Sequence, residues 1–383
     1  MPAKFIDRFS TSRFARMMAL FLTALLIFPD GIAVAQSCTT SNWNTSTHQL
    51  PNSIETLGAV VNSGFLYVVG GYTAGATLAT GTFRNTVDYV QLSTTNGSLM
   101  SNFALTSAQL PVPLARDLCS VAYKGYLYAV GGVESTSGTG FGTTTRAVRR
   151  GNIVLSGANL GDVNGWVSQT TALQEAVQLH GVVAMTVGST GYLYVIGGSL
   201  GTDIEQSQVT GHITDHVWYA PINSVDGSVG TFTQTASLPI KLYKTCPVVV
   251  NGTIYMSGGE TNANPSAVNT VYYATPNISD GSITSWSQSA NSLPNTLASQ
   301  AVAYVNTKGI VLMGGDQSGS GMDRPTVYEG VVGIPGSITW NTLTSLPNNI
   351  SRNAGATLNH YAYSVGGLEA GSDSKLVHCM QIQ

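Results

Sequence analysis

Charge is scarce in this sequence, and the scarcity excludes one large class of partner. Charged residues make up 9% of the 383 positions, the formal net charge is −3, and no basic run is longer than the pair Arg149-Arg150. A protein that binds nucleic acid needs clustered Lys and Arg side chains to neutralise phosphates. We therefore expect no nucleic-acid partner.

Histidine and cysteine are scarce as well, with six and four copies. His212 and His216 stand four positions apart, a spacing that suits zinc when both lie on a helix. Here they lead into an expected strand at 217–222, and in a strand residues four apart are separated by about 13 Å. That distance is too long for two ligands of one ion. We expect no metal site and no cofactor.

The only long apolar run is the twelve-residue segment Met17 to Phe28, which follows four basic residues and precedes Ala33-Val34-Ala35. This order is typical of a secretory signal peptide with an A-x-A cleavage site. Residues 1–35 are therefore predicted to be a signal peptide, with an uncleaved anchor as the alternative. The run is short for a membrane helix, so no stable span is expected after cleavage. The predicted location is the periplasm, the cell surface or the medium.

Glycine, in contrast, is abundant, with 43 copies, and Gly-Gly follows a short apolar run six times. The first glycines of the six pairs are Gly70, Gly131, Gly197, Gly258, Gly314 and Gly366, at spacings of 61, 66, 61, 56 and 52 residues. Repeated units of this length, rich in β-forming residues, predict the blades of a β-propeller.

The fourth unit shows the expected blade most clearly. Two apolar runs, 246–250 and 253–257, are joined by Asn251-Gly252, a strong hairpin signal. Further strands are predicted at 270–275 and at 283–288, which makes a four-stranded meander. An aromatic residue recurs in the fourth strand of each unit and is expected to pack between blades: Trp43, Phe103, Trp166, Phe232, Trp286 and Trp340.

This combination resembles the kelch repeat, in which Gly-Gly is followed by a Tyr and a Trp, here Tyr272 and Trp286 in the fourth unit. The resemblance covers six units and implies an all-β, six-bladed propeller over residues 36–383. Kelch propellers include galactose oxidase, a copper-radical enzyme with His and Tyr ligands, but the histidines here do not supply that set. The repeat identifies the fold but gives almost no information about activity.

The two ends of the chain are expected to meet. The chain after residue 35 opens with a fourth strand at Trp43 and ends with a third strand at 375–382, so the N-terminal strand should complete the last blade and close the ring. Cys38 and Cys379 would then lie on adjacent strands, and we predict a disulfide between them, with two separate thiols as the alternative. Cys119 and Cys246 fall in blades that are not neighbours and are expected to be free, buried thiols.

The loop after Gly-Gly and the loop after the fourth strand should share one face of the ring. That face collects most of the charge, including Glu55, Asp323 and Asp373. The residues expected nearest the axis are Tyr72, Arg116, Glu134, His180, Lys244, Glu260, Gln300, Asp316, Arg352 and Glu369. Such a ring of acids and bases suits a polar ligand, and the alternative is a set of rim salt bridges and turn caps.

We consider three hypotheses for function. The first is an exported binding module whose loop face engages a glycan or a cell-surface protein. The second is an enzyme that interconverts forms of a free sugar, because the chain is similar in plan to the exported kelch proteins that interconvert sialic-acid anomers. Glu134 or Glu260 would then be the base, and Arg116 or Arg352 would hold a carboxylate. The third is a structural piece of an envelope assembly.

Overall fold

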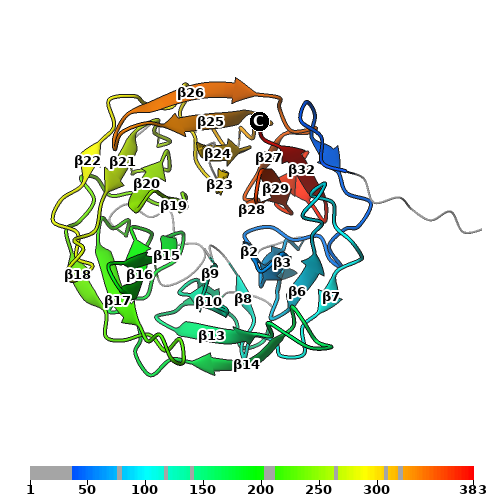
Figure 1. Ribbon diagram of the computed structural model, residues 1–383, viewed down its shortest axis with the longest axis horizontal. Helices are drawn as coiled ribbons and strands as arrows, with labels where there is room; N and C mark the ends of the chain where they lie inside the picture. Colours follow the sequence, from blue (N-terminus) through cyan, green and yellow to red (C-terminus); the bar gives the residue numbers. More distant parts are fainter. Residues whose placement is uncertain are drawn as a thin grey trace, which may run out of the picture. The chain divides into compact units, whose positions relative to one another are not determined.

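The computed structural model describes residues 37–75, 80–115, 120–138, 142–201, 212–262, 266–305, 309–317 and 322–383. These residues contain no α-helix and form six four-stranded antiparallel sheets. The sheets lie side by side around a central axis, which makes the fold a β-propeller (Figure 1). Nothing helical in these ranges has the length and apolar character needed to cross a membrane. The predicted signal peptide lies outside the described residues.

We number the sheets 1 to 6 in the order of their innermost strands and give the strands of each from the axis outward. Sheets 1 to 3 are β2 (Gly58–Asn62), β3 (Phe65–Val69), β6 (Val87–Gln91), β7 (Ala104–Leu105); β9 (Val121–Tyr123), β10 (Tyr126–Val130), β13 (Val148–Ile153), β14 (Val163–Ser168); and β15 (Gly181–Val187), β16 (Thr190–Ile196), β17 (Val217–Ile222), β18 (Thr233–Thr235).

Sheets 4 to 6 are β19 (Pro247–Val250), β20 (Thr253–Ser257), β21 (Val271–Ala274), β22 (Ser287–Gln288); β23 (Ala301–Val305), β24 (Gly309–Met313), β25 (Val327–Val332), β26 (Ile338–Leu343); and β28 (Ala354–Leu358), β29 (Tyr361–Val365), β32 (Val377–Gln381), β1 (Asn44–Thr45). Short strands in the loops beyond the sheets are β4 (Tyr72–Thr73), β5 (Thr82–Phe83), β8 (Leu114–Ala115), β11 (Val133–Glu134), β12 (Thr143–Thr144), β27 (Ile350–Ser351), β30 (Leu368–Glu369) and β31 (Ser372–Asp373).

The Gly-Gly pairs connect neighbouring sheets. Both glycines have positive φ, and a Cβ on Gly197 would lie 2.4 Å from the carbonyl oxygen of Leu242 in the next sheet's loop. The N–H of Gly198 donates to that same oxygen at 2.8 Å. All six pairs repeat this bond, through Gly71→Leu114, Gly132→Val177, Gly198→Leu242, Gly259→Leu297, Gly315→Ile350 and Gly367→Ile54. The last of these joins sheet 6 to sheet 1.

A tyrosine in the second strand of most sheets makes a further contact with the next sheet. Tyr194 donates its hydroxyl proton to the carbonyl of Gly281 at 2.7 Å. Equivalent bonds run Tyr67→Gly161, Tyr128→Gly227 and Tyr363→Gly97. Sheet 5 carries Leu312 at this place and so lacks the hydroxyl. Six apolar clusters fill the interfaces between neighbouring sheets of the described chain.

The N-terminal strand β1 pairs with β32, with Asn44 opposite Cys379. A disulfide joins Cys38 to Cys379, whose Cα atoms are 5.4 Å apart. The expectation of a free thiol at Cys246 is wrong, because this residue is disulfide-bonded. Cys246 directly precedes β19, the innermost strand of sheet 4. Cys119 lies outside the described residues.

Candidate functional site

Five residues at equivalent places, each just before an innermost strand, form a backbone belt around the axis. They are Thr56, Leu179, Lys244, Ser299 and Arg352, and all have φ between 53° and 57°. The N–H of Lys244 donates to Leu179, that of Ser299 to Lys244, that of Arg352 to Ser299 and that of Thr56 to Arg352, at 2.7 to 3.1 Å. Left-handed conformations cost energy for non-glycine residues and are found mostly where the surroundings impose them. We call these five residues the axial belt.

Lys244 of the belt lies in a buried cluster. Its Nζ atom is 3.1 and 3.0 Å from the two carboxylate oxygens of Glu260 and 5.0 Å from the ring centroid of Tyr243. The Tyr243 hydroxyl donates to Glu260 Oε2 at 2.8 Å. Burial and the adjacent carboxylate raise the pKa of Tyr243, so the phenol stays protonated and donates. The Lys244 ammonium is thus already matched by one carboxylate.

Arg352 of the belt interacts with the carboxylates of several acidic residues. Its Nη1 atom is 2.9 Å from Oε2 of Glu55, and the side chains are 43% and 4% exposed respectively. Burial raises the pKa of Asp323, while a hydrogen bond from Ser351 and the charge of Arg352 oppose that shift. Burial likewise raises the pKa of Asp373, which accepts a bond from the backbone N–H of Ala74 at 2.6 Å.

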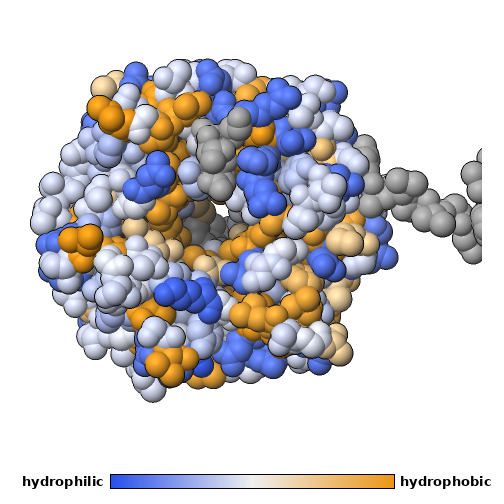
Figure 2. All heavy atoms as spheres, in the orientation of Figure 1, coloured by the Kyte–Doolittle hydropathy of each residue, from blue (hydrophilic) through white to orange (hydrophobic). Residues whose placement is uncertain are grey.

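Asp316 lies beside this group. It is buried, accepts a bond from the N–H of Met322 at 3.2 Å, and contributes to the raised pKa of Asp323 by charge repulsion. We call the following residues the axial site: Glu55, Tyr243, Lys244, Glu260, Asp316, Asp323, Arg352 and Asp373. Figure 2 shows that one face of the molecule is hollowed at the axis, with hydrophobic and hydrophilic side chains both reaching the walls.

No protein-family model and no curated protein matches the chain. Among solved structures, the chain is similar to the one titled "Structure of YjhT", with a TM-score of 0.60 and 13% sequence identity. The alignment covers 86% of this chain and 94% of that chain. At this identity the similarity concerns the fold alone, and it agrees with the β-propeller seen here.

Several residues expected at the axis lie elsewhere. Tyr72 is 2% exposed and packs edge-on against the ring of Phe83. His180 is buried against Gly131 of the preceding sheet. Burial lowers the pKa of His180 to about 4, so a neutral imidazole fills the interface between two sheets.

Gln300, like His180, is buried at the interface with the preceding sheet. Its amide donates to the carbonyl of Ser257 in that sheet at 2.7 Å. Glu134 on β11 forms an ion pair with the buried Arg149 on β13, not with a partner at the axial belt. Arg116 lies outside the described residues. Of the four best sequence candidates, the structure therefore brings Glu260 and Arg352 to the axial site.

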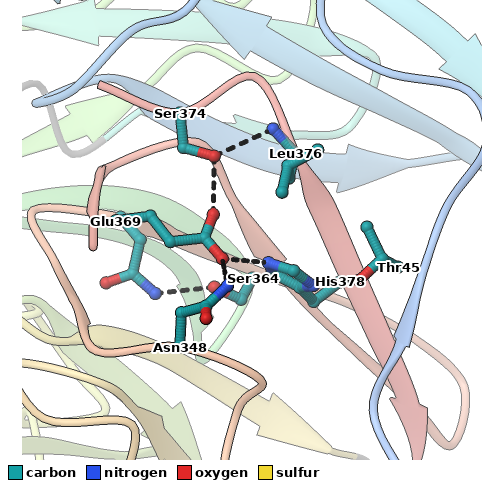
Figure 3. A network of polar contacts seen from close by, with 8 residues as sticks. Thr45, Asn348, Ser364, Glu369, Ser374, Leu376 and His378 are labelled. Carbon is teal, nitrogen blue, oxygen red and sulfur yellow. Dashed lines mark hydrogen bonds and ion pairs between the residues drawn. The ribbon is translucent and has the colours of Figure 1, made fainter. Parts of the chain in front are cut away.

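Glu369 is buried in a network of its own (Figure 3). Asn348 and Ser374 donate to its carboxylate at 2.9 and 2.6 Å, and Nε2 of His378 lies 3.0 Å away. Burial alone would raise the pKa of Glu369, but these hydrogen bonds outweigh it and lower the pKa to about 2. The other ring nitrogen of His378 is 2.9 Å from the hydroxyl of Thr45 on β1, so the network joins the two ends of the chain.

Glu55, Asp323 and Asp373 are the functional candidates that the sequence reasoning placed on the loop face without assigning them to the axis. A signal existed for Glu55. It stands fifteen residues before Gly70, as Tyr243 stands fifteen before Gly258, and both immediately precede a belt residue. Asp323 carried no such signal, because it reaches the site from a loop after Gly-Gly whose length differs between units.

The two histidines considered for metal binding are His212 and His216. His216 Nδ1 lies 2.7 Å from Glu175 Oε2, and both residues line a small pocket together with Trp218. Within the described ranges, no group of three or more His, Cys, Asp or Glu side chains is placed to hold a metal ion.

Proposed function

We propose that this chain is an exported, six-bladed kelch-type propeller, closed by its N-terminal strand, that binds a sugar or glycan at the axial site. The observation that carries the proposal is the axial belt. It holds Lys244 and Arg352 in fixed, left-handed positions, with fixed carboxylates around them. Fixed donors and acceptors suit a ligand rich in hydroxyl groups, because each hydroxyl can both donate and accept a hydrogen bond.

Isothermal titration with a panel of monosaccharides tests this proposal. We expect at least one pyranose to bind and Arg352→Gln to weaken it about tenfold or more, which corresponds to about 1.4 kcal/mol. Lys124→Gln is the matched control, since Lys124 is exposed in the turn between β9 and β10 and is also a cation with positive φ. Equal weakening by both variants, or no binding of any sugar, would contradict an axial sugar site. A cell-surface protein would then become the better ligand class.

A second candidate function is exchange between the anomers of a free sugar. Asp323 favours it, because burial raises its pKa beside the arginine Arg352. A carboxyl group whose pKa is raised is a stronger base than an ordinary aspartate, and anomer exchange needs only modest acid–base help. Asp323 would fill the role that the sequence gave to Glu134 or Glu260. The check is the rate of anomer exchange by NMR, which should fall to the uncatalysed rate in Asp323→Asn.

A further inference from the structure

A small pocket where sheets 2 and 3 meet brings together side chains that the axial site does not use. The lining residues that matter here are Leu173, Glu175, Val177, Val195, His216 and Trp218. The three aliphatic residues belong to the apolar cluster between the two sheets, and Trp218 packs against that cluster. Counted to its open mouth, the space is about 220 Å³, below the range of roughly 300–1,000 Å³ typical of drug-sized ligands. The pocket therefore suits a small molecule or a single side chain.

Contacts within the pocket fix the orientation of His216. Its Nδ1 atom lies 2.7 Å from Glu175 Oε2, and its ring is nearly perpendicular to that of Trp218, with the centroids 6.2 Å apart. In the neutral ring, Nδ1–H donates to Glu175 and Nε2 is a hydrogen-bond acceptor. The side chains of His216 and Glu175 are 35% and 30% exposed, so a ligand in the pocket can reach both.

Three groups of this pocket attract positive charge. Glu175 supplies a carboxylate, Trp218 supplies the aromatic ring that attracts cations most strongly, and Nε2 of neutral His216 accepts from an N–H donor. A carbon stem attached to the cation can contact the aliphatic lining. A hydroxyl group can use the same acceptors, but its hydrogen bonds are weaker than charge-assisted ones. A ligand carboxylate would be repelled by Glu175.

We propose that this pocket is a second binding site, which takes a primary ammonium group on a short apolar stem. Glu175 and Trp218 contact the ammonium group, and His216 accepts one of its N–H bonds at Nε2. None of the lining residues belongs to the axial site, so the proposal does not depend on sugar binding there. Two sources carry this chemistry, a free alkylamine and the lysine side chain of another protein.

Three probes that share one short carbon stem test the proposal: n-butylamine, n-butanol and butyrate. Each is titrated into the full chain at pH 7.5 while NMR follows the indole N–H signals of the five tryptophans. Trp218→Phe identifies the signal of Trp218 by its disappearance, and the other indole signals are the internal control. We expect butylamine to shift the Trp218 signal and to bind about fivefold or more tightly than butanol, with butyrate weakest.

Glu175→Gln keeps the size of the side chain and removes its charge. It should reduce the preference for butylamine over butanol about threefold or more and leave butanol affinity nearly unchanged. Asp280→Asn also removes one negative charge, but at a fully exposed turn, so the preference should not change. Nα-acetyl-lysinamide separates the two sources. Affinity equal to that of butylamine indicates the lysine side chain of a protein, and binding of butylamine alone indicates a free amine.

Three results would overturn the proposal. Butylamine could bind no better than butanol, all indole signals could shift equally, or the preference for butylamine could survive in Glu175→Gln. The first two are measured on the wild type, so they stand even where a variant fails to fold. None of the three bears on the axial sugar site, which the titration with monosaccharides tests separately.

Discussion

Two acidic regions of this molecule use carboxylates in opposite ways. In the closure region, which we define as β1, β32, the disulfide Cys38–Cys379 and the Glu369 network, the Glu369 carboxylate is held by the side chains of Asn348, Ser374 and His378. At the axial site, Arg352 is shared among several acids and is 43% exposed. A buried carboxylate held by several side chains stabilises the fold, whereas a part-exposed ion pair is accessible to a ligand.

The comparison predicts that changes in the closure region alter stability and changes in the axial site alter binding. The largest effect is expected from the double variant Cys38→Ser/Cys379→Ser. The disulfide spans a sequence separation of 341. Its loss should lower the free energy of unfolding by about 3–5 kcal/mol, because the unfolded chain regains entropy. Urea denaturation measures this, and titration with sugar should find unchanged affinity. A loss of affinity without a loss of stability would break the comparison.

The next effect concerns Glu369. Glu369→Gln should lower the free energy of unfolding by about 3 kcal/mol at neutral pH, because a buried, paired carboxylate is removed and its donors lose their acceptor. The matched control is Glu175→Gln. Glu175 also pairs with a histidine, but both side chains are about one-third exposed, so a loss below about 1 kcal/mol is expected. Equal losses in the two variants would show that burial of the network is not what matters.

The pH dependence of stability sharpens the same point. The pKa of Glu369 is lowered from 4.5 to about 2 in the folded state, so its contribution is complete above the unfolded value and is lost as the pH falls from 4.5 towards 2. Denaturation curves across this range should show the loss in the wild type. The slope should be smaller in Glu369→Gln. If the free energy of unfolding depended on pH in the same way in the two proteins, the loss of stability at low pH could not be assigned to Glu369.

A smaller effect on stability is expected at the axial site. Glu55→Gln frees Arg352, which is part-exposed and can be hydrated, so the free energy of unfolding should fall by only about 1 kcal/mol. Sugar affinity should nevertheless fall about tenfold, because Arg352 loses its fixed position. Thermal denaturation and titration on the same sample measure both. A large loss of stability with unchanged affinity would place Glu55 with Glu369 as a structural residue.

The smallest effect is expected at an interface remote from both regions. Tyr194→Phe removes one hydrogen bond to the carbonyl of Gly281 and should cost about 1 kcal/mol, with no change in sugar affinity. Tyr219→Phe is the control, because the ring of Tyr219 stacks on Tyr194 but lies partly exposed on the third strand. A change below about 0.5 kcal/mol is expected there. Equal effects would mean that ring packing, not the hydroxyl, joins the sheets.

The sequence predicted the repeat well and the site only in part. A Gly-Gly pair marked the end of the second strand in each sheet, because each repeated unit needs the same left-handed turn there. The structure places Glu260 and Arg352 in the axial site. Tyr72, His180 and Glu369, which the sequence also placed near the axis, are buried in an interface or a network.

The sequence by itself therefore determined the strands and their Gly-Gly ends, since these depend on local backbone preference and on a pattern that recurs along the chain. Only the tertiary structure decided which charges meet. Glu55 and Arg352 are 297 residues apart in sequence, and their contact exists because sheet 6 lies beside sheet 1. Whether a carboxylate is satisfied or left in excess depends on neighbours supplied by other sheets, and that is a property of three-dimensional packing, not of spacing along the chain.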